Sequence, residues 1–470
     1  MQINTTKKDI IWNYLGMFFS IGTQVIWMPI LVHYLSPAIL GLWYVFVSIG
    51  ALAELLDTGF TPTLSHVVSY AWSGAEDLKK QGVVFSNGNN QPNYDLVSSI
   101  MRACQLLFFG IACIAGILMS VAGTIYIRKI AYQYLSWEIY LTWVLYIIAT
   151  FINLYIGYYV VILVGIGDIY RRNRALILSK GCFLFLGSIG LICGFGIVSL
   201  GVAYFISGFV LRFSCRRYLL EYHKFGDFYS KCEKYSRRHI ISMMWPNAWR
   251  DGLVTITRYL NGQATVLLCS NYLDLYETGI YSFSMQVINA ILSISDGMMS
   301  AYIPAIQSAY TTGKKDVMKH LYEKAIGSFY VLSICGLTIF TLFGIPIVRF
   351  LRHDFIIQRS VYIVLAFSMW LMCRHGNSTW FISTMNKLPF TFSFVLSGIA
   401  SIILTFVFMD YFRMGVWGLI LGTLMVQSLY NNWKWNYVVN EYLDTNEWLL
   451  VKSGIKSLMR KVILKIKNKI

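Results

Sequence analysis

The sequence predicts an all-α integral membrane protein with about twelve transmembrane helices, arranged as two pseudo-symmetric six-helix lobes around a central cavity. Three observations lead to this fold class. Of the 470 residues, 57% are hydrophobic and only 13% are charged, whereas soluble domains carry about 25% charged residues. Apolar runs of roughly 20 residues, the length that crosses a bilayer, recur from end to end. Basic residues gather in alternate loops between these runs.

The apolar runs and the polar residues between them place the spans. The first run follows Lys7 and Lys8 and is longer than the roughly 7–15 apolar residues of a signal peptide, so we expect a retained span. The first half is expected to hold spans near 10–35, 39–60, 98–125, 137–165, 175–195 and 197–213. The second half is expected to hold spans near 241–270, 277–305, 325–348, 360–383, 390–409 and 415–435.

The distribution of charge predicts the orientation. The chain carries 39 Lys and Arg against 22 Asp and Glu, a formal charge of +17. An even number of spans places 30 of the basic residues on the side of the termini, six in the opposite loops and three within spans. By the positive-inside rule, we expect both termini to be cytoplasmic. Membrane orientation therefore explains the basic excess, and no nucleic-acid partner is expected.

Four segments are expected along the chain. They are an N-terminal lobe (1–215), a basic cytoplasmic linker (216–239), a C-terminal lobe (240–440) and a basic amphipathic cytoplasmic tail (441–470). Apolar residues recur at helical spacing from Ile455 to Ile470, with Lys and Arg between them. This pattern favours a helix lying on an anionic leaflet. A disordered, solvated tail is the alternative.

The two halves resemble each other at a shift of 238 residues. The matching positions are Tyr34-Leu35 with Tyr272-Leu273, Gly41 with Gly279, and Gly59 with Gly297. Because each half holds an even number of spans, both halves have the same orientation. Parallel repeats of this kind are typical of transporters with a substrate cavity between the halves. The repeat therefore favours a transporter over an enzyme.

Motifs for enzymatic chemistry are missing from the sequence. There is no G-x-x-x-x-G-K-[ST], H-E-x-x-H or G-x-S-x-G pattern. The nine cysteines form no C-x-x-C pair, so neither a metal site nor a disulfide framework is indicated. We expect no enzymatic activity, no cofactor and no metal.

Ionisable residues inside spans are costly and usually face a cavity or a partner. Arg250, Asp251 and Arg258 fall in the seventh span. The two arginines are about 12 Å apart along a helix and about 80° apart around it. Arg offers a bidentate fork to phosphate, so these side chains are candidates to hold a diphosphate. The alternative is that Arg250 reaches the cytoplasmic surface and pairs with Asp251.

Arg374 and His375 lie in the middle of the tenth span and are candidates to face the same cavity from the second half. The alternative is a buried structural pair between Arg374 and Asp296 or another acid.

Glu54 and Asp57 share one face of the second span at i, i+3 spacing. A carboxylate in a membrane can carry protons or bind a coupling cation. Alternatively, Asp57 caps a broken helix just before Gly59 and Pro62.

A set of short motifs carries a family resemblance. They are Trp12-Asn13-Tyr14-Leu15-Gly16, Met28-Pro29-Ile30, Tyr34-Leu35-Ser36, Gly41-Leu42-Trp43, Leu56-Asp57-Thr58-Gly59-Phe60 with Pro62, Ser73-Gly74, and Gly279-Ile280-Tyr281. With these motifs the chain resembles the polysaccharide-transport flippases of the multidrug/oligosaccharidyl-lipid/polysaccharide (MOP) exporter superfamily, specifically Wzx-type O-antigen flippases.

The resemblance implies alternating access of two lobes around a cationic cavity, coupled to an ion gradient or the membrane potential. The implied substrate is an undecaprenyl-diphosphate-linked oligosaccharide, moved from the cytoplasmic to the periplasmic leaflet during lipopolysaccharide biosynthesis. Implied partners are membrane lipids and the polysaccharide polymerase and chain-length machinery. Relatives often carry an acid near Asn261, so no coupling role is assigned to that position.

Other functions remain open at this point. Within transporters they are a cation/drug antiporter of the same superfamily and a flippase for a peptidoglycan or teichoic-acid precursor. A membrane-embedded polysaccharide polymerase or ligase usually has a large periplasmic loop, whereas the outer loops here are short. The hypothesis that Arg258, Arg374 and Arg250 hold the diphosphate predicts that Arg258→Ala and Arg374→Ala abolish surface polysaccharide without lowering the protein level.

Overall fold

The computed structural model describes residues 7–57, 59–78, 83–85, 92–222, 236–385 and 389–467. This part of the chain is almost entirely helical, apart from one short antiparallel hairpin of β1 (Ala75–Leu78) and β2 (Val83–Phe85).

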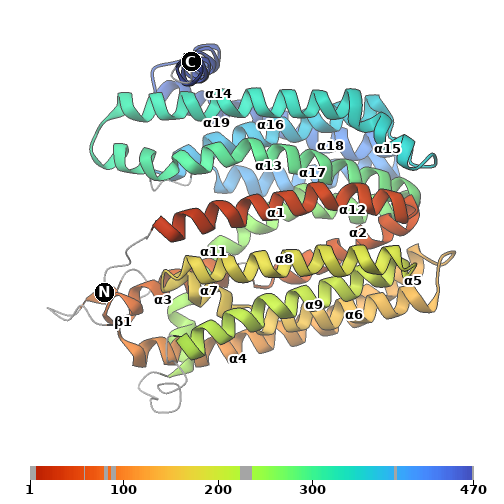
Figure 1. The fold of residues 1–470 in the computed structure, drawn as a ribbon, viewed down its shortest axis with the longest axis horizontal. Helices are drawn as coiled ribbons and strands as arrows, with labels where there is room; N and C mark the ends of the chain where they lie inside the picture. Colours follow the sequence, from red (N-terminus) through yellow and green to blue (C-terminus); the bar gives the residue numbers. More distant parts are fainter. Residues whose placement is uncertain are drawn as a thin grey trace. The chain divides into compact units, whose positions relative to one another are not determined.

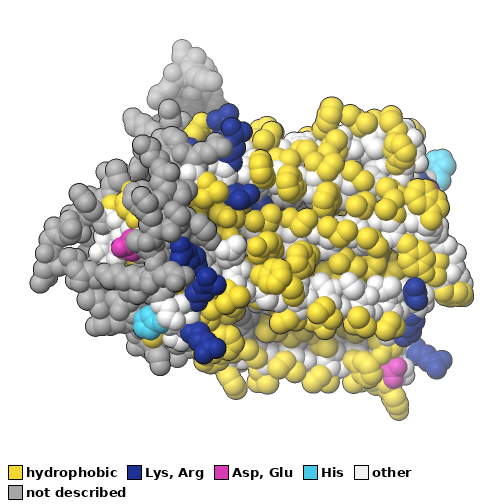
Figure 2. All heavy atoms as spheres, turned by 90° about the horizontal axis from the view of Figure 1, so that it is seen from below, with side chains coloured by type: hydrophobic (Ala, Val, Ile, Leu, Met, Phe, Trp, Pro, Cys, Tyr) yellow, Lys and Arg dark blue, Asp and Glu magenta, His cyan; other side chains and the backbone are white. Residues whose placement is uncertain are grey.

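The surface is that of a multi-pass membrane protein. Seven helices or helix runs in the described part are long and apolar enough to cross a bilayer. Figure 2 shows one face on which hydrophobic side chains form a broad band, with Lys and Arg gathered toward its ends. Phe350 and Phe392 are 82% and 78% exposed. Exposed apolar surface of this extent is typical of a protein that contacts lipid, and the prediction of an all-α integral membrane protein is confirmed.

The chain forms two compact units. Unit 1 comprises Met1–Leu35 and Leu42–Tyr259, and unit 2 comprises Ser36–Gly41 and Leu260–Ile470.

The helices of unit 1 pack as a bundle (Figure 1). In order they are α1 (Lys7–Tyr34), α2 (Pro37–Glu54), α3 (Phe60–Trp72), α4 (Tyr94–Leu118), the π-turn η1 (Met119–Gly123), α5 (Thr124–Ile130), α6 (Trp137–Tyr155), α7 (Tyr158–Gly165), α8 (Ile169–Ile192), α9 (Gly196–Arg217), the π-turn η2 (Tyr218–Tyr222) and α11 (Arg237–Asn261). Helix α8 packs against α1 and α9, α6 packs against α4 and α9, and α3 packs against α7.

Unit 2 continues from the end of α11. Its helices are α12 (Gln263–Tyr272), α13 (Leu275–Thr311), α14 (Lys315–Ile339), the π-turn η3 (Phe340–Gly344), α15 (Ile345–Leu351), α16 (Arg359–Ser383), α17 (Thr391–Asp410), α18 (Val416–Leu429), α19 (Asn431–Tyr442) and α20 (Glu447–Lys467). Helix α14 packs against both α13 and α20, α16 against α19, and α17 against α18.

Each of the twelve predicted spans coincides with a helix or with consecutive helices. Some boundaries were wrong: residues 61–72, expected in a loop, form α3, and α13 and α14 extend into the expected loop of residues 306–324. Phe60, Leu64 and Val68 recur at i, i+4 and i+8 and are all buried, so this segment has a helical apolar face that buries in the core of unit 1. The tail forms α20, which excludes the disordered alternative for 447–467.

The internal repeat is visible in the helix boundaries. Tyr34 and Tyr272 each end a helix, and Pro37 and Leu275 each begin the next one. Further along, 94–130 and 315–351 share one plan: an α-helix of 25 residues, a π-turn of five and an α-helix of seven. A π-turn is rare enough that matching positions argue for a common architecture in the two halves.

A pair of repeat-related glycines meets within unit 2. A side chain added at Gly41 would collide with the carbonyl of Leu275, and one added at Gly279 would collide with the carbonyl of Pro37. Pro37 and Leu275 are themselves repeat-related, so each glycine meets the residue four positions before the other glycine. The repeat therefore constrains residue size at this crossing of α2 and α13.

Candidate functional site

Unit 1 holds a cluster of charged side chains within its membrane-spanning helices, here called the unit 1 charge cluster. Its members are Glu54 at the end of α2, Asp57 in the following turn, Lys180 on α8 and Arg212 on α9. Arg212 lies within electrostatic range of both carboxylates, and Lys180 lies within range of Arg212. Three helices and one turn therefore bring two acids and two cations together.

The cluster is only partly closed. The carboxylate of Asp57 accepts hydrogen bonds from the Thr61 hydroxyl at 3.1 and 3.2 Å. Nε of Arg212 donates to the backbone oxygen of Asn153 at 3.4 Å. Within the described residues, no ion pair of 4.0 Å or less joins a cation of the cluster to Glu54 or Asp57. Glu54 is an exposed residue, and the two acids and two cations balance in formal charge without forming ion pairs with one another in the described part of the chain.

Asp57 also stands where α2 breaks. The two helices are separated by a turn, and the hydroxyl of Thr61 on α3 binds the Asp57 carboxylate. The backbone cap of α3 is Gly59, whose added side chain would collide with the carbonyl of Ala248 on α11. The predicted helix break is present. Among the described residues, the Asp57 carboxylate contributes to it by accepting a hydrogen bond from the Thr61 hydroxyl, not from a backbone N–H.

The three ionisable residues predicted on the seventh span lie on α11. The side chains of Arg250, Asp251 and Arg258 are outside the described residues, and their roles stay predictions.

Unit 2 places Arg374 in a different setting, here called the unit 2 ion pair. Arg374 is only 1% exposed and binds Glu447 in bidentate fashion, with Nε donating to Oε1 at 2.7 Å and Nη2 donating to Oε2 at 2.8 Å. Its Nη1 donates to the hydroxyls of Ser378 at 2.9 Å and Tyr322 at 3.2 Å. All three guanidinium nitrogens therefore have protein partners.

Glu447 is the first residue of α20, so this pair fixes the C-terminal helix to the bundle. The hydroxyl of Tyr330 donates to Glu447 Oε1 at 2.6 Å. Burial alone would raise the pKa of Glu447, but the charge of Arg374 holds it below its usual value. Gly327 on α14 and Gly454 on α20 meet so closely that a side chain on either would collide with the other's backbone. The alternative of a structural pair for Arg374 is thus the arrangement observed, with Glu447 as the acid.

The neighbours of Arg374 have other partners. Asp296 accepts hydrogen bonds from Asn377 at 2.9 Å and from the Cys373 thiol at 3.0 Å. Nδ1 of His375 lies 2.9 Å from Oδ1 of Asn432, and the ring is 5% exposed. Asn261 receives a hydrogen bond from Gln427 at 3.4 Å.

Sequence reasoning missed Lys180, Arg212 and Glu447. Lys180 and Arg212 lie at span ends and were counted with the cytoplasmic charges, although both positions fall inside α8 and α9. A basic residue within a helical apolar span was the available signal. No comparable signal marks Glu447.

No family model and no curated protein sequence matches this chain. Solved structures do. An inward-facing multidrug resistance transporter of the MATE family in the MOP superfamily superposes with a TM-score of 0.65 and 15% identity, over 93% of this chain and 100% of that one. An outward-facing MATE transporter gives 0.56 and 15%, over 94% and 98%.

A MOP superfamily transporter from Pyrococcus furiosus, whose reversed binding-pocket polarity suggests a different function, gives a TM-score of 0.55 and 15% identity, over 94% of this chain and 100% of that one. These similarities extend over nearly the whole chain. The protein therefore has the twelve-helix, two-lobed fold of MOP superfamily transporters.

Proposed function

We propose that the chain is a flippase that moves undecaprenyl-diphosphate-linked oligosaccharide units, O-antigen or a related surface polysaccharide, across a bacterial inner membrane. The direction is from the cytoplasmic to the periplasmic leaflet. The fold supports transport, because structural neighbours are transporters solved in inward- and outward-facing states. The sequence motifs and the positive-inside charge distribution support the substrate class and the cytoplasmic termini.

The unit 1 charge cluster carries the proposal. A diphosphate leaving water needs cations, and Arg212 and Lys180 supply them inside the bundle. The same cations repel an organic cation. The reversed polarity of its binding pocket suggests a different function for the Pyrococcus furiosus transporter. We likewise use the positive charge of Arg212 and Lys180 to propose the substrate of this chain.

In the proposed mechanism, Arg212 and Lys180 bind the diphosphate while the lipid tail stays in the bilayer. A bound diphosphate neutralises the positive charge of Arg212 that acts on Glu54 and Asp57, and each acid then favours a proton or a metal cation as a counter-charge. Substrate and coupling ion are thereby linked through shared charges. Arg250 and Arg258 remain predicted contributors from α11. Arg374 is assigned to anchoring α20.

The second candidate is a cation/drug antiporter, as the structural neighbours are named multidrug resistance transporters. The carboxylates of Glu54 and Asp57 are the observation that favours it.

A deletion strain separates the two candidates. A flippase deletion accumulates lipid-linked oligosaccharide in the cytoplasmic leaflet, measured by mass spectrometry after enzymatic labelling of the accessible leaflet. Complementation with Arg212→Ala is expected to leave the accumulation in place, whereas Arg216→Ala, an exposed position on the same helix, restores transport. Normal delivery of the units in the deletion strain, together with altered drug susceptibility, would replace the flippase by the antiporter.

A further inference from the structure

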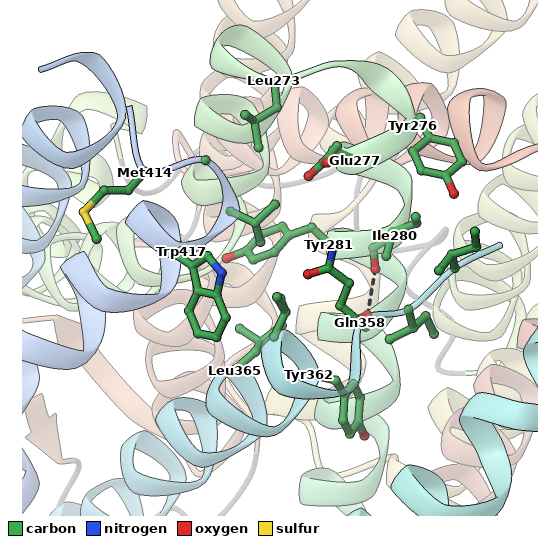
Figure 3. A pocket seen from close by; sticks show the side chains of 16 residues that line it. Leu273, Tyr276, Glu277, Ile280, Tyr281, Gln358, Tyr362, Leu365, Met414 and Trp417 are labelled. Carbon is green, nitrogen blue, oxygen red and sulfur yellow. Dashed lines mark hydrogen bonds between the residues drawn. The ribbon is translucent and has the colours of Figure 1, made fainter. Parts of the chain in front are cut away.

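Unit 2 contains a cavity of about 460 Å³, bounded by α13, α16 and the turn that precedes α18 (Figure 3). This volume is within the usual range for pockets that bind small molecules. Its lining comes from residues 273–284, 356–365 and 414–417. In the predicted topology these segments flank three outer loops, so the cavity lies at the outer end of unit 2. We call it the aromatic pocket.

The walls of the aromatic pocket are held by contacts outside it. The Tyr276 hydroxyl donates to the backbone oxygen of Asp354 at 2.7 Å, which ties α13 to the loop before α16. The Tyr281 hydroxyl bonds to Thr265 at 3.1 Å. Gly415 has φ of +58° and turns the chain into α18, which places Trp417 on the pocket wall. The pocket is therefore largely formed before any ligand arrives.

The chemistry of the lining is selective. Four aromatic residues contribute to it: Tyr276, Tyr281, Tyr362 and Trp417. Glu277, Ser284 and Gln358 are its hydrogen-bonding side chains beside the tyrosines, and none of the 16 lining residues is Lys or Arg. Figure 3 shows the Gln358 amide, the Glu277 carboxylate and the Trp417 indole around the same space.

This combination matches a sugar ring. The C–H face of a pyranose packs on an aromatic ring, while its hydroxyls require acceptors and donors at the edge, which Glu277 and Gln358 provide. A diphosphate is disfavoured, because the Glu277 carboxylate repels it and none of the lining residues carries a positive charge.

We propose that the aromatic pocket binds a saccharide ring of the transported unit at the outer end of unit 2. The inference rests on the proposed function for its ligand and adds a second site to it. The unit 1 charge cluster takes the diphosphate, and the aromatic pocket takes sugar. Charge and carbohydrate are thus recognised by different units of the chain.

The test uses the purified full chain in lipid nanodiscs. The probe is the oligosaccharide released by mild acid from the lipid-linked units that accumulate in the deletion strain, and binding is measured by calorimetry. Trp417→Ala is expected to weaken binding about tenfold or more, the effect of losing a central aromatic contact. Trp417→Phe, which keeps a ring, should retain part of the affinity, and Gln358→Ala should weaken it less. Trp433→Ala, an exposed indole on α19, is the matched control and should bind normally.

The outcomes distinguish the two proposals. A deletion strain without accumulated units would remove the proposed function, and the saccharide pocket with it. Accumulated units whose oligosaccharide does not bind, or binds equally to Trp417→Ala and Trp417→Phe, would overturn the pocket alone. A second probe, the organic cation tetraphenylphosphonium, tests the alternative ligand class. If this cation binds and its binding requires Glu277 and Trp417, while the saccharide does not bind, the pocket is an organic-cation site and the inference is overturned.

Discussion

The two units treat buried charge in opposite ways. In unit 2, Arg374 and Glu447 form a bidentate pair whose remaining groups are satisfied by Ser378, Tyr322 and Tyr330. In unit 1, Arg212 lies within electrostatic range of Glu54, Asp57 and Lys180, but the acids and cations of the charge cluster form no ion pair among the described residues. The repeat that is evident in the helix boundaries does not extend to these side chains.

This difference indicates which charges can bind a substrate or a coupling ion. A buried ion pair with every hydrogen bond made is costly to open, because each exposed partner becomes an uncompensated charge. Such a pair stabilises a permanent contact, here between α16 and the C-terminal helix α20. Charges that stay partly unpaired keep their capacity to bind an ion. The unit 1 charge cluster is therefore the better candidate for transport, and the unit 2 ion pair for stability.

Breaking the unit 2 ion pair gives the largest expected effect. Arg374→Ala leaves the carboxylate of Glu447 without its cation. Because this side chain is 35% exposed and solvent screens its charge, we expect a cost below the roughly 3–5 kcal/mol that is typical when a fully buried pair is broken. We expect a strongly reduced protein level and a lower unfolding temperature in detergent, measured by fluorescence-detected size exclusion after heating.

The double variant Arg374→Ala with Glu447→Ala is the control. Removing both charges avoids the orphaned carboxylate, so the double variant should be more stable than Arg374→Ala alone. A normally stable Arg374→Ala that fails to transport would reverse the comparison and return Arg374 to the substrate-binding role considered from the sequence.

Removing a cation from the unit 1 charge cluster should affect transport instead. Arg212→Ala loses a charge-assisted contact of about 1.5–3 kcal/mol, equivalent to roughly 10–150-fold in substrate affinity. Arg212→Lys should recover part of it, because charge is kept but the bidentate fork is lost. Flipping by purified protein in proteoliposomes measures both. Full activity of Arg212→Ala would eliminate the cluster as the diphosphate site.

Neutralising the acids of the same cluster tests coupling. Glu54→Gln and Asp57→Asn keep shape and hydrogen bonding while removing the charge that a proton or metal cation would balance. We expect transport driven by an imposed ion gradient to fall about fivefold, at the lower end of typical coupling free energies, while transport without a gradient changes little. An undiminished response to the gradient in both variants would confine these acids to a structural role.

The sequence predicts the features that depend on the length of apolar runs and on the helical spacing of apolar residues. Apolar runs located all twelve spans, and the helical spacing from Ile455 onward located the helical tail. It did not find the partner of Arg374, because Glu447 is 73 residues away and meets it only where α20 docks on α14. Lys180 and Arg212 were missed for a related reason: a charge at the end of a span is equally suited to the cytoplasm and to the bundle interior, and only packing decides.

The smallest expected effect comes from an exposed clasp near the unit 2 ion pair, between Lys315 and Asp444. The hydrogen bond from Lys315 and its charge lower the pKa of the Asp444 carboxyl. A lowered folded-state pKa stabilises the fold above the ordinary Asp range, and this contribution is lost as the pH falls through the folded pKa.

Asp444→Asn removes the charge yet tolerates the local backbone, which has φ of +48°. We expect a small drop in unfolding temperature at neutral pH that shrinks as the pH falls through the folded-state pKa of Asp444, which lies below the ordinary Asp value. Asp444→Asn and Arg374→Ala each break an ion pair that holds the same C-terminal segment. A larger loss of stability in Arg374→Ala would therefore be caused by the greater burial of its pair. A drop that persists unchanged at low pH would mean that the clasp stabilises through packing, for instance of Lys315 over the ring of Tyr442, and not through charge.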